Sequence, residues 1–195
     1  MGEFHDEVSR NNGRFAPLPG DIGLTPGLAL VRFCQTAPGE PATRAGHVFG
    51  FVGPGETLEA LWRVRVLPWA GRRGPCEVWR RRGLSAAQRG AVAEAARAYA
   101  GRGYGWWKLA AHLADWFLAW ALFGLSLGRR RGEAYVARRL LALERWPICS
   151  WVWARAYGQA LGLSLGEPGG CATPDGMRDY FMADPAWELI FRRAG

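Results

Sequence analysis

The sequence is poor in two of the residue types that carry protons in enzymes. It has one lysine, Lys108, and three histidines, His5, His47 and His112, in 195 residues. The net charge of +8 therefore comes from arginine. Two interpretations of this charge stay open, a solvated face or a basic patch for anionic lipid or nucleic acid. The arginine runs are not interleaved with aromatic residues as a groove for single strands requires, so we expect no nucleic-acid partner.

No pair of cysteines has the spacing of a structural zinc site. The four cysteines, Cys34, Cys76, Cys149 and Cys171, form no CxxC pair. Neither phosphate-loop pattern occurs, so we expect neither a metal nor an organic cofactor. The first residues lack the apolar core of a signal peptide, which favours the reducing cytoplasm and free thiols. A membrane-peripheral place, or delivery by a phage or a secretion system, is the alternative.

No apolar run is long enough to span a bilayer. The most apolar stretch, 106–128, contains Lys108, His112 and Asp115. Its uninterrupted part is shorter than the roughly 20 residues that a spanning helix needs. We predict one or two buried or surface-docked helices here, within a Trp-rich helical insert of about 104–145. An amphipathic element that faces a membrane is the alternative.

Periodicity and turn residues predict an α+β fold with an antiparallel sheet packed against helices. We expect one domain over 17–195, after a flexible lead-in over 1–16. The predicted strands are a short one ending at Thr25, then 47–52, 57–66, 75–83 and 187–191. The predicted helices are 28–37, 86–100 after the capping box of Ser85 and Gln88, 149–161, and a short one that begins at Pro174.

Cys149 is the candidate nucleophile. It follows Pro147 and begins a predicted helix, where unpaired N–H groups and the helix dipole stabilise a thiolate. The backbone N–H of Cys149 or of Ser150 could also supply an oxyanion-hole donor. Judged by position alone, a buried core cysteine stays the alternative.

His47 and Glu59 are the candidate base and its orienting acid. A nucleophilic thiol needs a base, and His47 begins a strand, whereas His5 lies in the lead-in and His112 in an apolar helix. A turn over 53–56 places Glu59 near His47 on the same face of a hairpin. Glu59 would then fix the tautomer of the imidazole and stabilise its charged form. The alternative for Glu59 is an edge residue that faces water.

Five short motifs occur in a characteristic order. They are GDI (Gly20–Ile22), GHVFGFV (Gly46–Val52), LEA (Leu58–Ala60), ICSWVWARAYG (Ile148–Gly158) and TPDG (Thr173–Gly176). With this set the chain resembles the circularly permuted papain-like cysteine hydrolases of the NlpC superfamily, and more distantly lecithin retinol acyltransferase. The resemblance covers about 19–191 and implies a permuted papain-like fold. In that fold the histidine strand comes first and the cysteine helix comes last.

The resemblance implies a Cys-His-Glu triad. Cys149 would be the nucleophile, His47 the general base and then acid, and Glu59 the orienting residue, with Asp21 structural or near the site. The expected reaction is hydrolysis of an amide bond, in a cell-wall peptide or an acylated amine, through an acyl-enzyme. Thioester cleavage or acyl transfer on a lipid is the alternative on the same triad. A non-catalytic basic protein that binds nucleic acid or a membrane surface is the alternative from another class.

The tryptophans offer a candidate substrate groove. We expect a small molecule, a peptide or a lipid-linked acyl group as the partner, with peripheral membrane contact as a further expectation. Trp106, Trp107 and Trp151 would line the groove. Plain core packing is the alternative for these rings.

Overall fold

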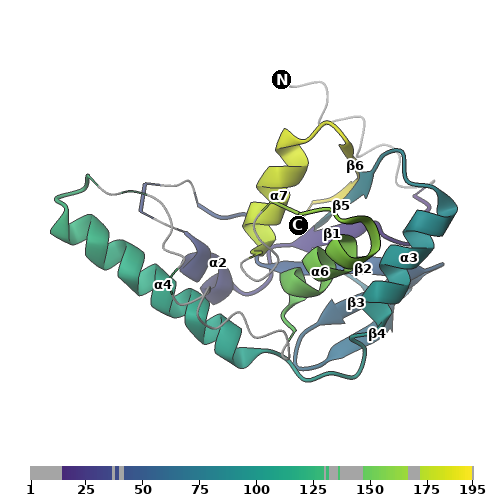
Figure 1. Ribbon diagram of the computed structural model, residues 1–195, viewed down its shortest axis with the longest axis horizontal. Coiled ribbons are helices and arrows are strands. Elements are labelled where there is room, and N and C mark those ends of the chain that lie inside the picture. Colours follow the sequence, from purple (N-terminus) through teal and green to yellow (C-terminus); the bar gives the residue numbers. More distant parts are fainter. Residues whose placement is uncertain are drawn as a thin grey trace.

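The chain forms an α+β fold, as expected, with a six-stranded antiparallel sheet and helices against it (Figure 1). The computed structural model describes residues 15–36, 38–39, 42–129, 131, 136, 147–166 and 172–194. The strands are β1 (Ile22–Thr25), β2 (His47–Gly53), β3 (Glu56–Ala60), β4 (Val64–Pro68), β5 (Cys76–Arg81) and β6 (Trp187–Arg193). The helices are α2 (Ala29–Gln35), the short 3₁₀ helix η1 (Trp69–Gly71), α3 (Ala86–Arg97), α4 (Trp106–Leu125), α6 (Cys149–Leu161) and α7 (Pro174–Ala183).

The strands lie in the order β4-β3-β2-β1-β5-β6. β2 is therefore an inner strand, and every residue in it after His47 is buried. The register pairs Thr25 of β1 with His47 and Phe49 of β2 with Glu59 of β3. This arrangement puts the first residue of β2 at the end of the strand nearest to α2 and α4 (Figure 1).

The two faces of the sheet are covered differently. α3 and α6 pack on one face, where Val48 and Val52 of β2 join the main hydrophobic core. Phe49 and Phe51 alternate with these valines and so point to the opposite face. There they join a smaller aromatic cluster of buried and half-buried residues, which includes Phe15, Trp69 and Phe191.

α6 is buried around most of its circumference. It lies close to β2 because Gly50 has no side chain, and a Cβ atom there would come within 2.4 Å of the Trp153 ring. The Tyr157 hydroxyl donates a hydrogen bond of 2.6 Å to the carbonyl oxygen of Gly20, just before β1. Gly162 ends the helix in the left-handed region, with φ at 67°. The sheet and these contacts hold the first turn of α6 in place.

The predicted helix starts are confirmed. The Ser85 hydroxyl accepts a hydrogen bond from the Gln88 N–H, and the Gln88 side chain accepts one from the Ser85 N–H. Thr173 caps α7, with Pro174 at its first position. The capping box helix ends at Arg97 rather than at residue 100, and turns complete the expected stretch.

The predicted strand over 57–66 is wrong, because the chain bends at 61–63 and returns as β4. The bend contains neither glycine nor proline, and an apolar residue stands at every second position from Leu58 to Val66. The sequence therefore carries no turn signal at this point. Arg63 pairs with Gly103, which ties the bend to the segment before α4.

Most of the described part of the insert is one helix, α4. None of the helices in the described ranges is long and apolar enough to cross a bilayer. Most of the predicted insert after residue 129 lies outside the described residues. The same is true of His5, Cys171 and most of the predicted lead-in.

We expect the substitution Gly50→Ala to weaken the packing of α6 on β2. The new methyl group would overlap the Trp153 ring, and overpacking of this kind costs about 1–3 kcal/mol in the free energy of unfolding. Gly90→Ala in α3 is the matched control, because a Cβ atom there would have no atom of the described residues within 4 Å. The control should be neutral or stabilising by up to about 1 kcal/mol. Urea unfolding of both variants measures the difference, and equal stabilities would contradict the close contact.

Candidate active site

His47 and Glu59 share one face of the sheet, as predicted. Phe49 pairs directly with Glu59, so His47, two residues earlier on β2, is its diagonal neighbour. The His47 Nε2 atom lies 3.0 Å from the Glu59 Oε2 atom. Both side chains are almost buried, with exposed fractions of 12% and 7%. The contact leaves Nδ1 of His47 as the ring nitrogen that can meet a nucleophile.

The segment before His47 is fixed by α7 and β1. The Asp175 carboxylate accepts hydrogen bonds from the N–H groups of Arg44 and Ala45, at 2.9 and 3.0 Å. The Gly46 N–H donates to the Thr25 carbonyl oxygen at 2.9 Å. Backbone contacts on both sides thus hold the entry into β2, and with it the position of the imidazole.

Arg72 is part of the site although the sequence does not reveal it. It follows η1 and donates a hydrogen bond of 2.5 Å to the same Glu59 Oε2 atom that His47 contacts. Its guanidinium lies 3.9 Å from the centre of the Phe49 ring. Arg72 and His47 thus hold the same carboxylate oxygen of Glu59. Arg72 stands next to Arg73 in a loop, and no sequence pattern distinguishes it from the other arginines of the chain.

Cys149 reaches this pair from the first turn of α6. Its thiol is buried and hydrogen-bonded to His47. The N–H groups of Val48 and Ser150 also point to its sulfur. The Gly105 N–H donates to the Pro147 carbonyl oxygen at 2.8 Å, which fixes the entry into α6. The structure therefore brings the three predicted triad residues together.

The charges of Cys149 and His47 support each other. Burial raises the pKa of the Cys149 thiol, but the charge and hydrogen bond of His47 and the N–H groups of Val48 and Ser150 outweigh it, so that this pKa lies below its ordinary value. Burial lowers the pKa of His47, but the charge and hydrogen bond of Cys149, with those of Glu59, raise it to about 9. Both shifts favour a thiolate beside an imidazolium.

Glu59 is held in its charged form. Burial raises the pKa of this carboxyl group, but the hydrogen bond from His47 and the charge and hydrogen bond of Arg72 outweigh it and lower the pKa. A carboxylate beside Nε2 favours the imidazolium and keeps a proton on that nitrogen. Glu59 can therefore act as the orienting residue.

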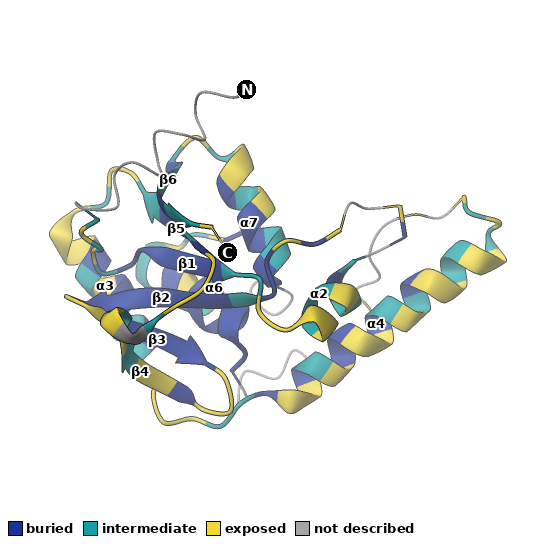
Figure 2. Cartoon of the chain, turned by 180° about the vertical axis from the view of Figure 1, so that it is seen from behind, coloured by how far each residue is buried: buried dark blue, intermediate teal, exposed yellow. Residues whose placement is uncertain are grey.

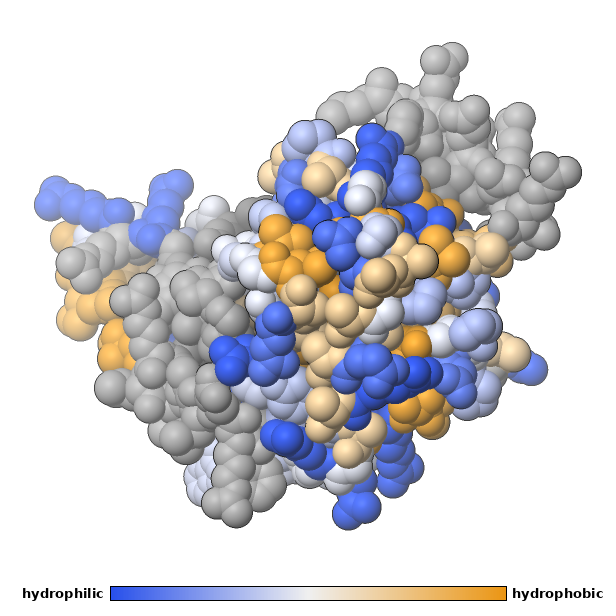
Figure 3. Space-filling model, turned by 45° about the vertical axis from the view of Figure 1, so that its right-hand side comes forward, coloured by the Kyte–Doolittle hydropathy of each residue, from blue (hydrophilic) through white to orange (hydrophobic). Residues whose placement is uncertain are grey.

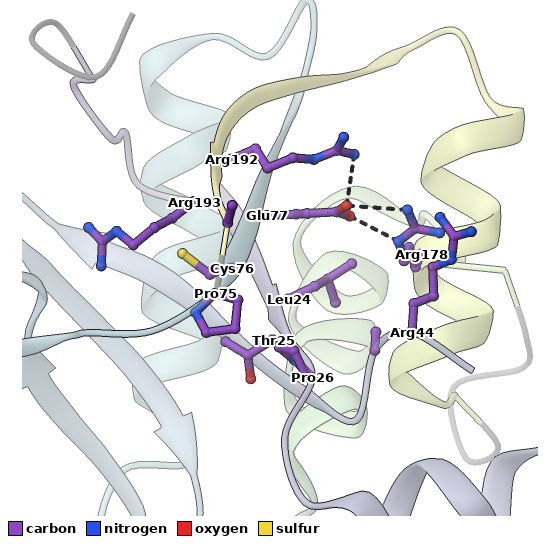
Figure 4. A pocket seen from close by; sticks show the side chains of 12 residues that line it. Leu24, Thr25, Pro26, Arg44, Pro75, Cys76, Glu77, Arg178, Arg192 and Arg193 are labelled. Carbon is purple, nitrogen blue, oxygen red and sulfur yellow. Dashed lines mark hydrogen bonds and ion pairs between the residues drawn. The ribbon is translucent and has the colours of Figure 1, made fainter. Parts of the chain in front are cut away.

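The other described cysteines have no such environment. Burial raises the pKa of Cys34 and of Cys76. Cys76 borders a hollow of about 150 Å³ that Cys149 does not line, and there Glu77 binds both Arg178 and Arg192 (Figure 4). The described residues that line this hollow include no histidine. Within the described ranges, Cys149 is the cysteine whose pKa falls.

A pocket of about 460 Å³ opens over the triad. Its lining includes the three triad residues and Arg72. Apolar and aromatic side chains from α2, the bend after β3 and the start of α4 form most of the remaining wall: Leu28, Val31, Leu61, Trp62, Tyr104, Trp106 and Leu109. The site can therefore accept an apolar group next to the thiol.

Tyr104 is a second residue that sequence analysis missed. It lines the pocket, and burial together with the nearby charge of Cys149 raises the pKa of its hydroxyl. The hydroxyl thus keeps its proton across the working pH range and stays a hydrogen-bond donor. Its position before a predicted helix gives no hint of this proximity.

Ser150 and Asp21 have structural contacts. The Ser150 hydroxyl donates to the Ala172 carbonyl oxygen at 2.5 Å, and only its N–H faces the nucleophile. Asp21 is fully buried and binds Arg80 and Arg89, at 2.6 and 3.3 Å. Asp21 does not line the pocket, which agrees with the structural role expected for it.

One of the three tryptophans predicted for a substrate groove lines the pocket over Cys149. Trp106 lines the pocket. Trp107 is 72% exposed and does not line it. Trp151 is buried in the core, where its ring packs against Tyr99 and lies 3.9 Å from the Lys108 Nζ atom. The prediction for Trp151 fails because this residue of the first turn of α6 points into the protein, away from the cavity.

No metal site is formed by the part of the chain that the structure describes. Its histidine, cysteine, aspartate and glutamate side chains nowhere gather in threes in an arrangement that could hold a metal ion. In the triad itself, the Glu59 oxygen that a cation would need already accepts hydrogen bonds from Arg72 and His47. With these two contacts in place, the Glu59 carboxylate stabilises the imidazolium of His47 rather than a metal ion.

We expect Cys149 to be the fastest of the cysteines to react with iodoacetamide near neutral pH. The reaction needs the thiolate, and the pKa of Cys149 is lowered mainly by the charge of His47. The imidazolium is lost as the pH rises through about 9, which sets the upper end of the ion pair. Site-resolved mass spectrometry across pH measures this, with His47→Ala as the comparison. Equal rates for Cys149, Cys34 and Cys76 would contradict the ion pair.

We expect Arg72→Met to shift the acidic limb of this reaction to higher pH. The charge of Arg72 lowers the pKa of Glu59, so its removal raises that pKa, and His47 loses its anionic partner at a higher pH. Arg72→Lys keeps the charge and should restore most of the wild-type profile. A pH profile unchanged in Arg72→Met would show that Arg72 does not act through Glu59.

Comparison with known proteins gives a fold and no family. No family model and no curated protein matches the chain. The structure is similar to the crystal structure of metalloprotein yiiX from Escherichia coli O157:H7, DUF1105. The likeness has a TM-score of 0.60 at 18% identity and covers 93% of this chain and 100% of that one. At this identity the likeness shows a common fold alone.

Proposed function

We propose that this chain is a cysteine hydrolase with a permuted papain-like fold and a Cys-His-Glu triad. One observation carries the proposal. The thiol at the start of α6 is hydrogen-bonded to His47, and His47 is bound to Glu59, inside an open pocket. The order of these elements along the chain, with the histidine strand before the cysteine helix, supports the permuted arrangement.

The first half of the reaction acylates the enzyme. The Cys149 thiolate attacks the carbonyl carbon, and a C–S bond forms while the carbonyl oxygen becomes an oxyanion. The N–H of Cys149 and the Tyr104 hydroxyl are the donors offered to that oxyanion, because the N–H of Ser150 already faces the sulfur. The imidazolium of His47 then gives its proton to the leaving amine as the C–N bond breaks.

The second half releases the acyl group. Neutral His47 takes a proton from water, whose oxygen attacks the thioester carbonyl. The C–S bond breaks, the carboxylic acid leaves, and the thiolate and imidazolium are restored. Glu59 and Arg72 stay charged throughout and hold the imidazole in place, which keeps Nδ1 directed at the reacting atoms.

The substrate is proposed to be an amide, in a cell-wall peptide or an acylated amine. The apolar pocket wall favours a second candidate, in which the same triad cleaves a thioester or transfers the acyl group of a lipid. Both candidates share the acyl-enzyme at Cys149. They differ in the leaving group and in the acceptor that resolves the thioester.

We expect Cys149→Ser and His47→Ala to remove activity on a chromogenic ester or amide with an apolar acyl chain. The loss should be about a thousandfold or more in kcat/KM for each, because the nucleophile and its base act as one unit. Glu59→Gln keeps the hydrogen-bonding shape without the charge and should cost less, about a hundredfold. Cys34→Ser is the control and should keep full activity. Full activity in Cys149→Ser would disprove the mechanism.

A further inference from the structure

The long helix α4 is inverted, with its polar residues inside and its apolar residues outside. Lys108, His112 and Asp115 are all buried, at exposed fractions of 4%, 8% and 1%. In contrast, Trp107 is 72% exposed and Phe117 is 60% exposed. A helix on the surface of a protein in water normally shows the reverse arrangement.

The exposed residues of α4 form one continuous stripe. They recur at every third or fourth position, which is the spacing of one helix face. None of them is polar or charged: Trp106, Trp107, Ala110, Leu113, Ala114, Phe117, Trp120, Ala121, Gly124 and Leu125. Figure 2 shows α4 projecting from the body of the molecule with exposed and buried residues alternating along its length. A helix of 20 residues presents this stripe over about 30 Å.

Two neighbouring segments extend the apolar surface. In and just before α2, Leu28, Leu30 and Phe33 are exposed, and the Phe33 ring lies 4.7 Å from that of Trp116. In the bend after β3, Leu61 and Trp62 are exposed, and the Trp62 ring lies 5.0 Å from that of Trp106. We call this set, with the α4 stripe, the α2–α4 surface. It is far too extended to be the scattered apolar exposure of an ordinary surface.

The α2–α4 surface runs into the pocket over the triad. Leu28, Leu61, Trp62 and Trp106 belong both to the exposed surface and to the pocket wall. An apolar chain can therefore stay in contact with apolar side chains from this surface into the pocket over Cys149. The outside of the molecule and the site share one apolar lining.

Arginines lie beside both ends of the α4 stripe. Arg63 and Arg102 are exposed near the start of α4, where Arg63 pairs with Gly103. Arg129 and Arg131 are exposed just beyond its end. At the far end of α4, on the left of Figure 3, hydrophobic side chains lie beside strongly hydrophilic ones. An apolar strip with cations at its ends matches the acyl region and the anionic headgroups of a bilayer.

Two features favour a bilayer over a second copy of the chain. Tryptophan is enriched where a protein meets a membrane surface. The α4 stripe contains three, Trp106, Trp107 and Trp120. A two-fold contact through this surface would bring the arginines of two copies together, each copy with a net charge of +8. Anionic lipid would instead neutralise them.

We propose that the α2–α4 surface docks this protein onto an anionic lipid bilayer, with the pocket mouth facing the acyl region. The helix would lie in the plane of the interface, since its charged residues are turned into the protein. This inference does not rest on the proposed reaction, because docking needs the apolar surface and its arginines but not the thiol. It adds to the proposed function a route by which an acyl chain reaches the site.

The test is binding of the full chain to lipid vesicles. We expect wild type to float with vesicles of phosphatidylcholine and phosphatidylglycerol, and to bind vesicles of phosphatidylcholine alone more weakly. Trp107→Glu and Phe117→Glu place a charge on the stripe and should each weaken binding about tenfold or more. Met182→Glu is the matched control, an exposed apolar residue on α7, and should bind like wild type. Cys149→Ser should also bind like wild type.

A second measurement uses wild type alone, so its result does not depend on whether a variant folds. Tryptophan fluorescence of wild type should be quenched by vesicles that contain brominated phosphatidylcholine together with phosphatidylglycerol, because Trp107 and Trp120 would enter the acyl region. Absence of both flotation and quenching would overturn the proposal. So would vesicle binding that both stripe variants leave unchanged. A stable dimer that Phe117→Glu dissociates would assign the surface to a second copy and would overturn it too.

Discussion

The contact between Cys149 and His47 is the interaction on which the rest of the site depends. The two residues are about a hundred positions apart in the chain and belong to different layers of the fold. They meet because α6 lies directly on β2, where Gly50 makes room for the Trp153 ring. Close packing places the first turn of the helix beside the first residue of the strand. The thiol then gains the N–H groups of Val48 and Ser150 as well as the imidazole.

Burial opposes both charges of this pair, and the structure offsets burial with a line of alternating charge. Arg72 binds Glu59, Glu59 binds His47, and His47 binds Cys149. Each member favours the charged form of the next, so the thiolate depends in part on an arginine that does not touch it. This chain of contacts also fixes geometry, because Glu59 occupies one ring nitrogen of His47 and leaves the other for the reaction.

Local patterns predicted much of the fold and singled out Cys149, His47 and Glu59, which the structure brings together. Their roles as a triad came from the resemblance. The capping box at Ser85, the hairpin that joins His47 to Glu59 and the helix that begins at Cys149 each depend on neighbouring residues. Arg72 and Tyr104 could not be predicted, because their roles come from the way distant segments pack. The same limit explains Trp151, which we expected in a groove although the core encloses it. The permuted papain-like fold and the activity stay proposals.

The inverted helix α4 gives the pocket an apolar approach, and the proposed triad gives it a nucleophile. The two features are separable. The proposed chemistry depends on the ion pair of Cys149 and His47. The most direct measurement is the ultraviolet absorbance of the thiolate across pH, taken as the difference between wild type and Cys149→Ser. We expect the thiolate of wild type to persist at pH values well below 9.0, the ordinary pKa of a cysteine, and to be lost at neutral pH in His47→Ala. A thiolate that forms only near that ordinary value in wild type would contradict it.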